Sequence, residues 1–594
     1  MSFDFQAYWD QLPLSEAERS VAMQLAAIAG QAQPGAWSLL GLIQHVLVQG
    51  SVCLDLKTLS DGPSWSDWQP YLKAPLVSQS LTSPVVVDGH GLAYFARFYD
   101  YQVRLVRQLK TLMHRQDMGE DLNAIQVVLD RFFPPELPLF RVIDGPDLQR
   151  LAVLMALLRP LVLVTGGPGT GKTTTVAKML GALLSSAEEP ERLRIQLLAP
   201  TGKAAARLTD SLRDAVEKLE PLQAFAHLVP QSASTLHRAL GLYGNAGPRH
   251  HLDNPLAADI IVVDEASMID LEVFCYLLEA VPAHARLVLL GDPHQLMSVE
   301  VGAVLGDLFQ SEPTYTPRFR HKVTQVSEDS LPSARLKGPL ADSCVHLQKS
   351  YRFGSDTTLG RLAETCLAGD AKRAWHQLLP CGVHVPQEPG VYRFENLHPL
   401  KAIECLIRTF LVPRFRLVGP SDRLEQLKVF QLLTALKNGP LGVSALNAWT
   451  EGLLADLGLV DRDQDYYDGR PLLVTQNDYG LGVFNGDQGI VQKTQREAQV
   501  AFEGPNGLRL LNPYHLPGHE TNYAMTIHKS QGSEYDVVAV VLPPSESGII
   551  SRNLIYTALT RAKSRVFFIT EQKEFFQAVE TAMGRVSGLA MDLP

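Results

Sequence analysis

One short stretch constrains the fold more than any other part of the sequence. Residues 161–180 read LVLVTGGPGTGKTTTVAKML, in which an apolar run leads into a glycine-rich segment and then into residues that favour a helix. Within it, GGPGTGKT at 166–173 matches the pattern G-x-x-x-x-G-K-[S/T] of a P-loop, whose backbone N–H groups face phosphate oxygens. A strand before the loop and a helix after it are the context that this pattern requires. The stretch therefore predicts a phosphate-binding loop between a buried strand and a helix.

The P-loop residues have separate expected roles. The Lys172 ammonium group would reach the β- and γ-phosphates of a nucleotide, and the Thr173 hydroxyl would ligate Mg²⁺. The other residues predicted to contact the nucleotide are Gly166, Gly167, Pro168, Gly169, Thr170, Gly171 and Thr174. ATP with Mg²⁺ is thus the expected cofactor.

Short apolar runs recur along the chain after residue 151. The runs LVLVTG, RIQLLAPTG, DIIVVDEAS and ARLVLLGD each end in small or polar residues, and helical segments lie between them. Strands that are apolar on both faces and alternate with helices predict a parallel sheet covered by helices. Because ligands bind beyond the carboxyl ends of the strands in such sheets, the polar ends of these runs are candidate site residues.

A second α/β pattern follows in the C-terminal half, with KVFQLLTAL, YDVVAVVLP and SRVFFIT as its apolar runs. Between them, short alternating strands with NG, GD and GPNG turns predict a small β-barrel insert at 466–518. The polar, proline-containing residues 311–343 are predicted to be a loop or an interdomain connector. The expected domains are a small α+β domain at 1–135, a P-loop α/β domain at 136–345 and a second α/β domain at 346–594.

Acidic and amide residues stand at the ends of two predicted strands. Asp264, after the run IIVV, would hold Mg²⁺ through water, and its neighbour Glu265 would orient and deprotonate an attacking water molecule. Gln295, in LLGDPHQL, is a candidate to contact the γ-phosphate or that water. The pair of carboxylates behind a P-loop indicates nucleotide hydrolysis, since a kinase would activate its acceptor instead.

Two arginines in the C-terminal half are candidates to stabilise charge on the γ-phosphate. Arg352 lies in LQKSYRF and Arg561 in YTALTRAK. The second α/β half has no P-loop of its own, so it is expected to close over the first and bring an arginine to the nucleotide. A cleft that closes on ATP and opens on ADP can drive a motor stroke. A surface salt bridge is the alternative role for either arginine.

Polar residues at other strand ends suit the backbone of a single nucleic-acid strand, which hydroxyls, amides and single bases can contact. The predicted contacts are Thr201, Lys203, His237, Arg238, Thr526, His528, Lys529, Ser530 and Gln531. The formal net charge of −10 argues against a protein that coats nucleic acid through its overall charge. It leaves room for a local basic groove, because salt screens charges beyond about 8–10 Å.

Several other classes of protein are disfavoured. No run of apolar residues is long enough to indicate a membrane span, and the N-terminal residues lack the basic and apolar regions of a signal peptide. The six cysteines are far apart in the sequence and form no C-x-x-C motif, which favours core thiols in a reducing cytoplasm over a zinc site.

Nine motifs together resemble those of superfamily 1 helicases, and most closely those of the RecD branch. In order they are GGPGTGKT, APTGKAAARL, STLHRAL, VVDEASMID, LGDPHQL, LQKSYRFG, FNGDQG, TIHKSQGSE and YTALTRAK, and the resemblance covers about residues 140–580. It implies two RecA-like domains with ATP between them and 5′–3′ translocation on single-stranded DNA. It also implies that the chain is one of two motors in a RecBCD-type complex that unwinds and processes double-stranded DNA ends.

The resemblance assigns further roles by position. Gln149 matches the glutamine that reads adenine, and Arg352 and Arg561 match arginines that reach the γ-phosphate. The insert at 466–518 corresponds to an SH3-like domain, and residues 242–254 to a small β-hairpin pin. The domain at 1–135 would dock onto RecB-like and RecC-like subunits of a heterotrimer. Any nuclease centre is expected in a partner, because no acidic cluster with nuclease spacing stands out in this chain.

Three alternatives remain open at this point. Stand-alone RecD-like helicases carry a longer N-terminal region with helix-hairpin-helix elements, and the residues before position 136 show none. A regulatory NTPase switch would not translocate, and the paired α/β halves disfavour it. A scaffold subunit with a decayed motor is disfavoured because Lys172, Glu265 and Arg561 are all present.

Overall fold

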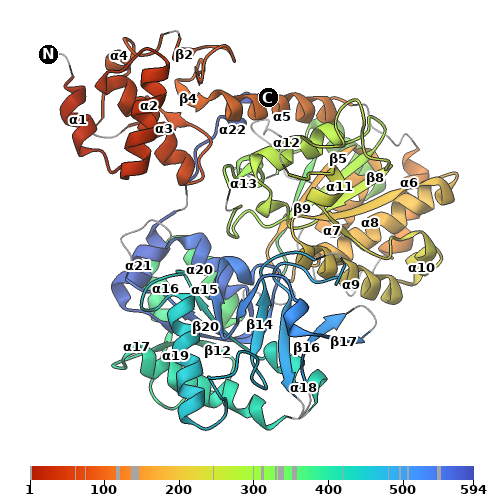
Figure 1. Ribbon diagram of the computed structural model, residues 1–594. Coiled ribbons are helices and arrows are strands. Elements are labelled where there is room, and N and C mark those ends of the chain that lie inside the picture. Colours follow the sequence, from red (N-terminus) through yellow and green to blue (C-terminus); the bar gives the residue numbers. More distant parts are fainter. Residues whose placement is uncertain are drawn as a thin grey trace.

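In the part of the chain that the structure, a computed structural model, describes, there are four β-sheets with helices packed around them (Figure 1). The structure describes residues 3–59, 62–73, 75–115, 121–134, 146–244, 247–298, 300–309, 313–327, 331, 340–350, 357–417, 419–478, 480–493, 497–504, 507–544, 550–582 and 584–593. Among these residues, no helix is both long enough and apolar enough to cross a membrane.

The N-terminal unit combines helices with a small sheet. Its helices are α1 (Phe5–Gln11), α2 (Glu16–Ile28), α3 (Pro34–Val48) and α4 (Trp65–Trp68), and its strands are β1 (Leu54–Asp55), β2 (Val77–Ser78), β3 (Val85–Val87) and β4 (Leu92–Phe95). Helix α2 begins at a capping box, in which the Ser15 hydroxyl accepts from the Glu18 N–H and the Glu18 carboxylate accepts from the Ser15 N–H. Trp9, Leu39 and Trp68 are buried between these elements.

The first large sheet is parallel throughout, with the strand order β10-β5-β9-β8-β6-β7. Its strands are β5 (Leu161–Gly166), β6 (Ile195–Ala199), β7 (Ser234–Thr235), β8 (Ile260–Val263), β9 (Arg286–Gly291) and β10 (Cys344–Leu347). The helices around it include α7 (Leu148–Leu158), α8 (Lys172–Ser186), α9 (Gly202–Lys218), α11 (Leu236–Leu240), α12 (Leu271–Ala280) and α13 (Val304–Leu308). Strands β5 and β8 are buried along their whole length, as expected for strands with helices on both faces.

Two helices that precede residue 136 belong to the packing of this sheet. Helix α5 (Ala96–Met113) buries Leu105 and Leu109 in the core that contains α12, and α6 (Leu122–Phe132) buries Leu129 in the core that contains α8. The C-terminal helix α22 (Leu589–Asp592) also returns to α5, and the two lie side by side in Figure 1. The domain boundary near residue 135 stays a prediction. Helices α5 and α6, which precede it in the sequence, pack in the hydrophobic cores of the first parallel sheet.

Part of the segment predicted as a loop is helical instead. Residues Pro317–Val326 form α14, and Phe319, Val323 and Val326 are buried against α6 and its neighbours. The loop prediction is wrong for this stretch, because the spacing of these three apolar residues places them on one face of a helix. Thr316 caps the helix, since its hydroxyl accepts from the Phe319 N–H.

The second large sheet is also parallel, with the order β11-β12-β21-β20-β13-β19. Its strands are β11 (Leu379–Cys381), β12 (Gly390–Phe394), β13 (Phe430–Thr434), β19 (Ala524–Thr526), β20 (Tyr535–Val541) and β21 (Ala562–Ile569). The helices that cover it are α15 (Thr358–Leu367), α16 (Ala371–Gln377), α17 (Pro399–Leu406), α18 (Pro420–Leu427), α19 (Val443–Asp456), α20 (Arg552–Leu559) and α21 (Gln572–Glu580). The α/β class with two parallel sheets is confirmed. We refer to the two sheets with their helices as the first and second motor domains.

The predicted β-rich insert forms an antiparallel sheet with the order β17-β16-β15-β14-β18. Its strands are β14 (Pro471–Val474), β15 (Gln488–Lys493), β16 (Ala498–Gly504), β17 (Gly507–Leu511) and β18 (His519–Thr521). Leu472, Val491 and Phe502 lie in its small core. The last strand lies just beyond the predicted end at 518, and an SH3-like fold for the insert stays a prediction.

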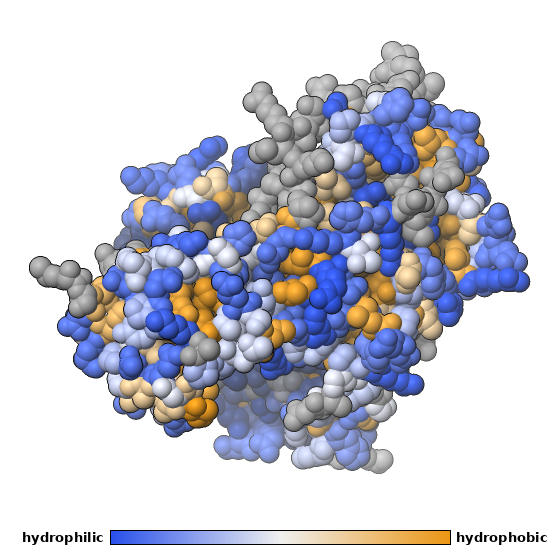
Figure 2. Space-filling model, turned by 90° about the horizontal axis from the view of Figure 1, so that it is seen from above, coloured by the Kyte–Doolittle hydropathy of each residue, from blue (hydrophilic) through white to orange (hydrophobic). Residues whose placement is uncertain are grey.

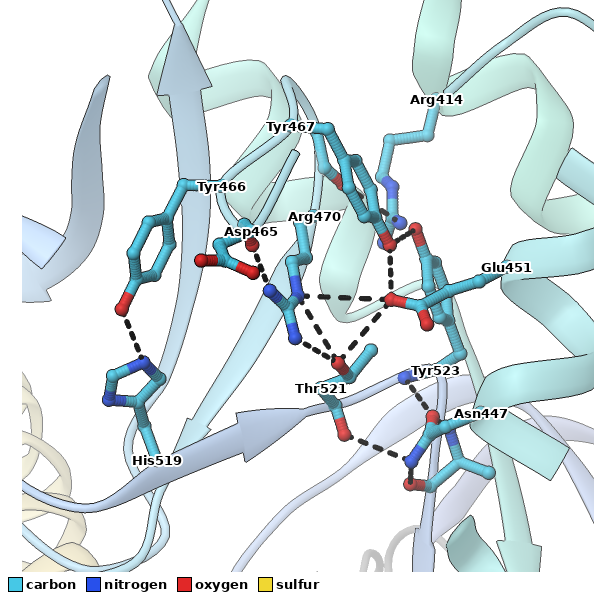
Figure 3. Close-up of polar contacts among 12 residues, drawn as sticks. Arg414, Asn447, Glu451, Asp465, Tyr466, Tyr467, Arg470, His519, Thr521 and Tyr523 are labelled. Carbon is cyan, nitrogen blue, oxygen red and sulfur yellow. Dashed lines mark hydrogen bonds and ion pairs between the residues drawn. The ribbon is translucent and has the colours of Figure 1, made fainter. Parts of the chain in front are cut away.

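A network of hydrogen bonds joins both ends of the insert to α19 of the second motor domain (Figure 3). The Tyr467 hydroxyl, where the chain enters the insert, donates to Glu451 at 2.7 Å and lies 3.0 Å from the Tyr523 hydroxyl, where the chain leaves. Arg470 donates to the Thr521 hydroxyl at 2.7 Å. Hydrogen bonds at both chain crossings join the insert to the second motor domain as one unit.

Candidate functional site

The P-loop connects β5 to the N-terminus of α8. Gly169 and Gly171 adopt φ angles of +74° and +83°, a left-handed conformation that glycine adopts without the steric cost of a Cβ atom. Gly171 is the N-cap residue of α8, so the first backbone N–H groups of the helix have no intrahelical acceptor. The Thr170 hydroxyl donates to the Gly167 carbonyl at 2.9 Å and closes the loop. This arrangement forms an anion-binding helix terminus.

The Lys172 side chain folds into the centre of this loop. Its Nζ donates to the carbonyls of Gly166 at 2.6 Å and Gly167 at 3.1 Å. Thr173 and Thr174 continue into the first turn of α8. On the neighbouring α7, the Gln149 side chain donates to the Thr170 carbonyl at 3.4 Å, which places this predicted adenine contact beside the loop.

The two predicted carboxylates follow β8 directly. The Asp264 N–H donates to the Leu198 carbonyl at 2.9 Å, and the Asp264 carboxylate accepts from the Glu265 N–H at 2.8 Å. Glu265 adopts a φ angle of +52°, which is uncommon for a residue with a side chain and is found where the surrounding structure enforces it. The backbone therefore turns sharply at the point where the two carboxylates stand.

Electrostatics place these carboxylates beside the P-loop lysine. Burial and the Glu265 carboxylate raise the pKa of Asp264 to about 6, while Lys172 opposes the shift. Carboxylates and a threonine hydroxyl supply hard oxygen ligands of the kind that Mg²⁺ prefers. Thr173 and Asp264 thus fit the predicted magnesium site, in which a divalent cation would offset the cost of the buried carboxylate.

Arg561 reaches this region from the second motor domain. The side chain is 2% exposed, and its guanidinium donates to the carbonyls of Thr557 at 3.1 Å and Ser533 at 3.3 Å. Burial lowers its pKa, and the Glu265 carboxylate is the largest of the charges that oppose this effect. The charge of Glu265, predicted from the other half of the sequence, therefore acts on Arg561 across the domain interface. Arg352 lies outside the described residues.

Gln295 lies in a turn between the two motor domains. Its Nε2 donates to Asp292 Oδ2 at 3.1 Å, and the Tyr556 hydroxyl of α20 donates to the same oxygen at 3.1 Å. A Cβ atom placed on Gly167 would lie 3.0 Å from the Tyr556 hydroxyl, so this tyrosine stands directly over the P-loop. The turn thereby connects the P-loop to a helix of the second motor domain.

The same turn makes three further hydrogen bonds across the domain interface. The Leu296 N–H donates to the Thr557 hydroxyl at 2.8 Å, and the Asn553 amide donates to the His294 carbonyl at 2.9 Å. Gln531, a predicted DNA contact, donates from its side chain to the Leu296 carbonyl at 2.8 Å. The turn at 292–296 is therefore bonded to α20, whose Tyr556 stands over the P-loop, and also to Gln531, a predicted DNA contact.

The first group of predicted DNA contacts follows β6 and β7. The Thr201 hydroxyl caps α9 by accepting from the Ala204 N–H at 3.2 Å. Lys203 donates to the Gly486 carbonyl of the insert at 3.2 Å and bonds the Ser533 hydroxyl, and burial lowers its pKa to about 8. His237 and Arg238 are exposed on α11.

The second group forms a single turn after β19. The Thr526 hydroxyl accepts from the Lys529 N–H at 3.2 Å, and the Lys529 ammonium pairs with Glu520 at 2.6 Å. Burial lowers the pKa of His528. The Ser530 side chain is fully buried and donates to the Ile527 carbonyl at 2.7 Å. The bond between Lys203 and Ser533 brings the two groups together at the interface of the motor domains.

Four residues in this region escaped prediction from the sequence: Arg207, Asp292, Glu534 and Tyr556. Arg207 follows Lys203 by four positions, a spacing that places both on one face of α9. Asp292 follows a strand just as Asp264 does, which is a signal that the sequence offered. Glu534 and Tyr556 lie in the motifs TIHKSQGSE and YTALTRAK, but their contacts are with distant segments that these motifs do not identify.

Two family models match this chain. The model described as an AAA domain matches residues 149–301, which contain the P-loop and the strands through β9. The model described as a UvrD-like helicase C-terminal domain matches residues 521–569, which contain the turn after β19 and Arg561.

Curated proteins match over most or all of the chain. The RecBCD enzyme subunit RecD of Mycobacterium tuberculosis is 36% identical over 599 residues, a match that covers 98% of this chain and 95% of that protein. The subunit of the same name from Haemophilus influenzae is 34% identical and covers 84% of this chain and 80% of that protein. The ATP-dependent RecD2 DNA helicase of Deinococcus radiodurans is 32% identical and covers 68% of this chain and 46% of that protein.

Proposed function

This chain belongs to the family of RecD subunits of the RecBCD enzyme, and on that premise we propose that it moves 5′–3′ along single-stranded DNA as one motor of a RecBCD-type complex. Membership of the family makes it an ATP-dependent DNA helicase. The observation that carries the proposal is the contact of the second motor domain with the P-loop region, where the Tyr556 hydroxyl bonds Asp292 and stands over Gly167. A nucleotide bound at the P-loop would lie between the two domains.

Nucleotide binding is assigned to the first motor domain. The N–H groups at the start of α8 and the Lys172 ammonium would bind the phosphates, and the Gln149 side chain would contact the adenine. Thr173 and Asp264 would hold Mg²⁺, which neutralises phosphate charge when bound. The Lys172 ammonium is bonded to the Gly166 and Gly167 carbonyls of its own loop, which supports its proposed role in binding phosphates.

Hydrolysis is assigned to groups on both sides of the interface. The Glu265 carboxylate would accept a proton from the attacking water, and the Gln295 amide would orient that water. The Arg561 guanidinium would neutralise charge that develops on the γ-phosphate, and Arg352 is proposed for the same role on the basis of its motif. None of these steps requires a covalent intermediate on the protein.

Movement on DNA is assigned to the contacts that join the two motor domains. Thr201, His237 and Arg238 would contact the strand from the first domain, and residues 526–531 from the second. Lys203 would exchange its bonds to Gly486 and Ser533 for a DNA phosphate. Because residues 292–296 bond both α20 and Gln531, a change at the nucleotide would shift the DNA-binding turn.

RecB-like and RecC-like chains are the proposed partners, with the N-terminal unit as the docking part and double-stranded DNA ends as the substrate of the complex. This unit lies at the opposite end of the molecule from the insert (Figure 1). It exposes apolar side chains, with Ile28 83% and Val48 74% exposed. On the face seen in Figure 2, hydrophobic side chains form several separate groups among hydrophilic ones. The structure records the six cysteines as thiols rather than as disulfides, which supports a place of work in the reducing cytoplasm.

A stand-alone helicase is the second candidate, and the extent of the match disfavours it. The match to the mycobacterial RecD subunit covers 98% of this chain, whereas the match to the RecD2 helicase covers 68%. Similarity that extends through the N-terminal unit supports the role of a subunit within a complex.

Replacing Lys172 by glutamine tests the proposed function. We expect ATP hydrolysis and 5′–3′ movement to fall by about 10²–10³-fold, the effect typical of losing a preorganised charge at a reaction centre. Assembly with the partner chains should remain intact, because the P-loop lies apart from the N-terminal unit. The assay is displacement of streptavidin from the 3′ end of a single strand by the purified complex.

A matched control lies on the same helix. Lys178, on α8, has its ammonium group 3.9 Å from the centre of the Phe133 ring and makes no described contact with the P-loop. Lys178→Gln should move along DNA at the rate of the natural chain. Normal movement by Lys172→Gln would overturn the proposed function.

A further inference from the structure

Two cationic side chains on α9 reach from the first motor domain to the second. Lys203 bonds the Ser533 hydroxyl, and one turn later the Arg207 guanidinium forms an ion pair with the Glu534 carboxylate. Ser533 and Glu534 follow the turn that is proposed to contact DNA, with only Gly532 between them and Gln531. This two-residue segment therefore links the first half of α9 to the second motor domain.

The Arg207 guanidinium also interacts with the carboxylates behind the P-loop. Burial would lower its pKa, but the carboxylates of Glu534, Glu265 and Asp264 outweigh burial and raise it. Arg207 in turn lowers the pKa of Asp264. One guanidinium thus interacts with a carboxylate of the second domain and with two carboxylates of the first.

The position of α9 relative to these carboxylates is fixed by the first sheet. The Thr201 hydroxyl caps the helix directly after β6, and β6 pairs with β8 along its length. The Asp264 N–H is bonded to the Leu198 carbonyl of β6 at 2.9 Å. Movement of the second domain therefore changes the distance between Arg207 and Glu534 far more than the distance between Arg207 and Asp264.

We propose that Arg207 is a positioning residue that couples the carboxylates Asp264 and Glu265 to the second motor domain through Glu534, and so makes ATP hydrolysis depend on bound DNA. The proposal rests on the proposed function, in which Glu265 activates water. The Arg207 side chain is held between Glu534 and the two carboxylates of the first domain, and it keeps Asp264 and Glu265 in place relative to the second domain. When Glu534 withdraws, Arg207 loses this partner and the two carboxylates lose their link to the second domain.

The effect of this coupling on the DNA-stimulated kcat should be moderate. The Arg207 side chain is 39% exposed and the Glu534 side chain 15%, so solvent screens the pair in part. We expect Arg207→Gln and Glu534→Gln each to lower the DNA-stimulated kcat about tenfold. The KM for ATP and the affinity for single-stranded DNA should change less than about twofold, because neither residue is proposed to touch either ligand.

Combined variants separate coupling from simple attachment. The double variant R207Q/E534Q should be no slower than either single variant, since both remove the same interaction. The exchanged pair R207E/E534R restores an ion pair between the domains but places a carboxylate next to Glu265, and it should remain at least tenfold slower than the natural chain. Arg207→Lys, which keeps the charge, should recover part of the stimulated rate.

A second ion pair on the same helix provides the control. Arg213 and Asp210 lie 3.7 Å apart on the exposed side of α9, within the first motor domain. Arg213→Gln should leave the stimulated kcat unchanged. All rates are measured on the full chain, with and without a single-stranded oligonucleotide, after circular dichroism has shown that each variant is folded.

The outcomes distinguish this inference from the proposed function. If DNA stimulates the natural chain and Arg207→Gln equally, or if the exchanged pair recovers the natural rate, the coupling role is overturned while the proposed function stands. If DNA does not stimulate the natural chain at all, the proposed function fails, and the coupling role fails with it.

Discussion

Replacing Arg561 by alanine is expected to lower the kcat for ATP hydrolysis by about 10³-fold or more, the scale of losing an arginine that stabilises phosphoryl transfer. The guanidinium is buried, and the Glu265 carboxylate acts on it from the first motor domain. Because its charge acts on the transition state, the KM for ATP should change far less than kcat. Steady-state hydrolysis with saturating single-stranded DNA measures both constants.

Two further variants make the Arg561 result interpretable. Arg561→Lys keeps the charge but cannot reproduce the planar donor geometry that reaches both the Thr557 and Ser533 carbonyls, so it should also be strongly impaired. Arg565→Ala, on the same strand region but bonded to Gln387 on the surface, should hydrolyse ATP at the natural rate. Equal rates for Arg561→Ala and the natural chain would remove Arg561 from the hydrolytic site.

Replacing Glu265 by glutamine should lower kcat by about 10²–10⁴-fold, the usual contribution of a general base. Glutamine retains the shape of the side chain but cannot accept the proton of the attacking water. ATP binding should remain, because the P-loop and Lys172 are unchanged. Equilibrium binding of a fluorescent ATP analogue, together with single-turnover hydrolysis, separates the two effects.

A carboxylate outside the site controls for the loss of charge. Glu272, on α12, accepts from the Tyr101 hydroxyl at 2.7 Å and pairs with Arg97 on the outside of the first motor domain. Glu272→Gln should hydrolyse ATP at close to the natural rate. If Glu265→Gln turned over ATP as fast as Glu272→Gln, water activation would have to be assigned to another group.

The parallel sheets could be predicted from sequence because their strands are covered on both faces. Such strands appear as unbroken apolar runs, and the runs ending near Gly166, Val263 and Gly291 all correspond to observed strands. The P-loop and the two carboxylates were predictable for a related reason, since each follows directly on one of those runs. These features depend on local sequence and on the geometry of strand ends.

The contacts between the motor domains could not be predicted, because they join segments far apart in the chain. Arg207 and Glu534 are 327 positions apart, and neither stands in a pattern that names its partner. Burial of Ser530 and the bonds of Lys203 to Gly486 and Ser533 also arise only when the two domains meet. The amphipathic pattern of α14 was present in the sequence and was obscured by the prolines around it.

The most direct test of ATP-driven stepping is steady-state ATP hydrolysis by the purified full chain on single-stranded oligonucleotides of increasing length. A motor that steps along a strand remains engaged for longer on a longer strand. We therefore expect the rate to rise with length to a plateau in the natural chain and to stay near zero at every length in Lys172→Gln. A rate that is the same without DNA and at every length would contradict stepping and would indicate a nucleotide switch.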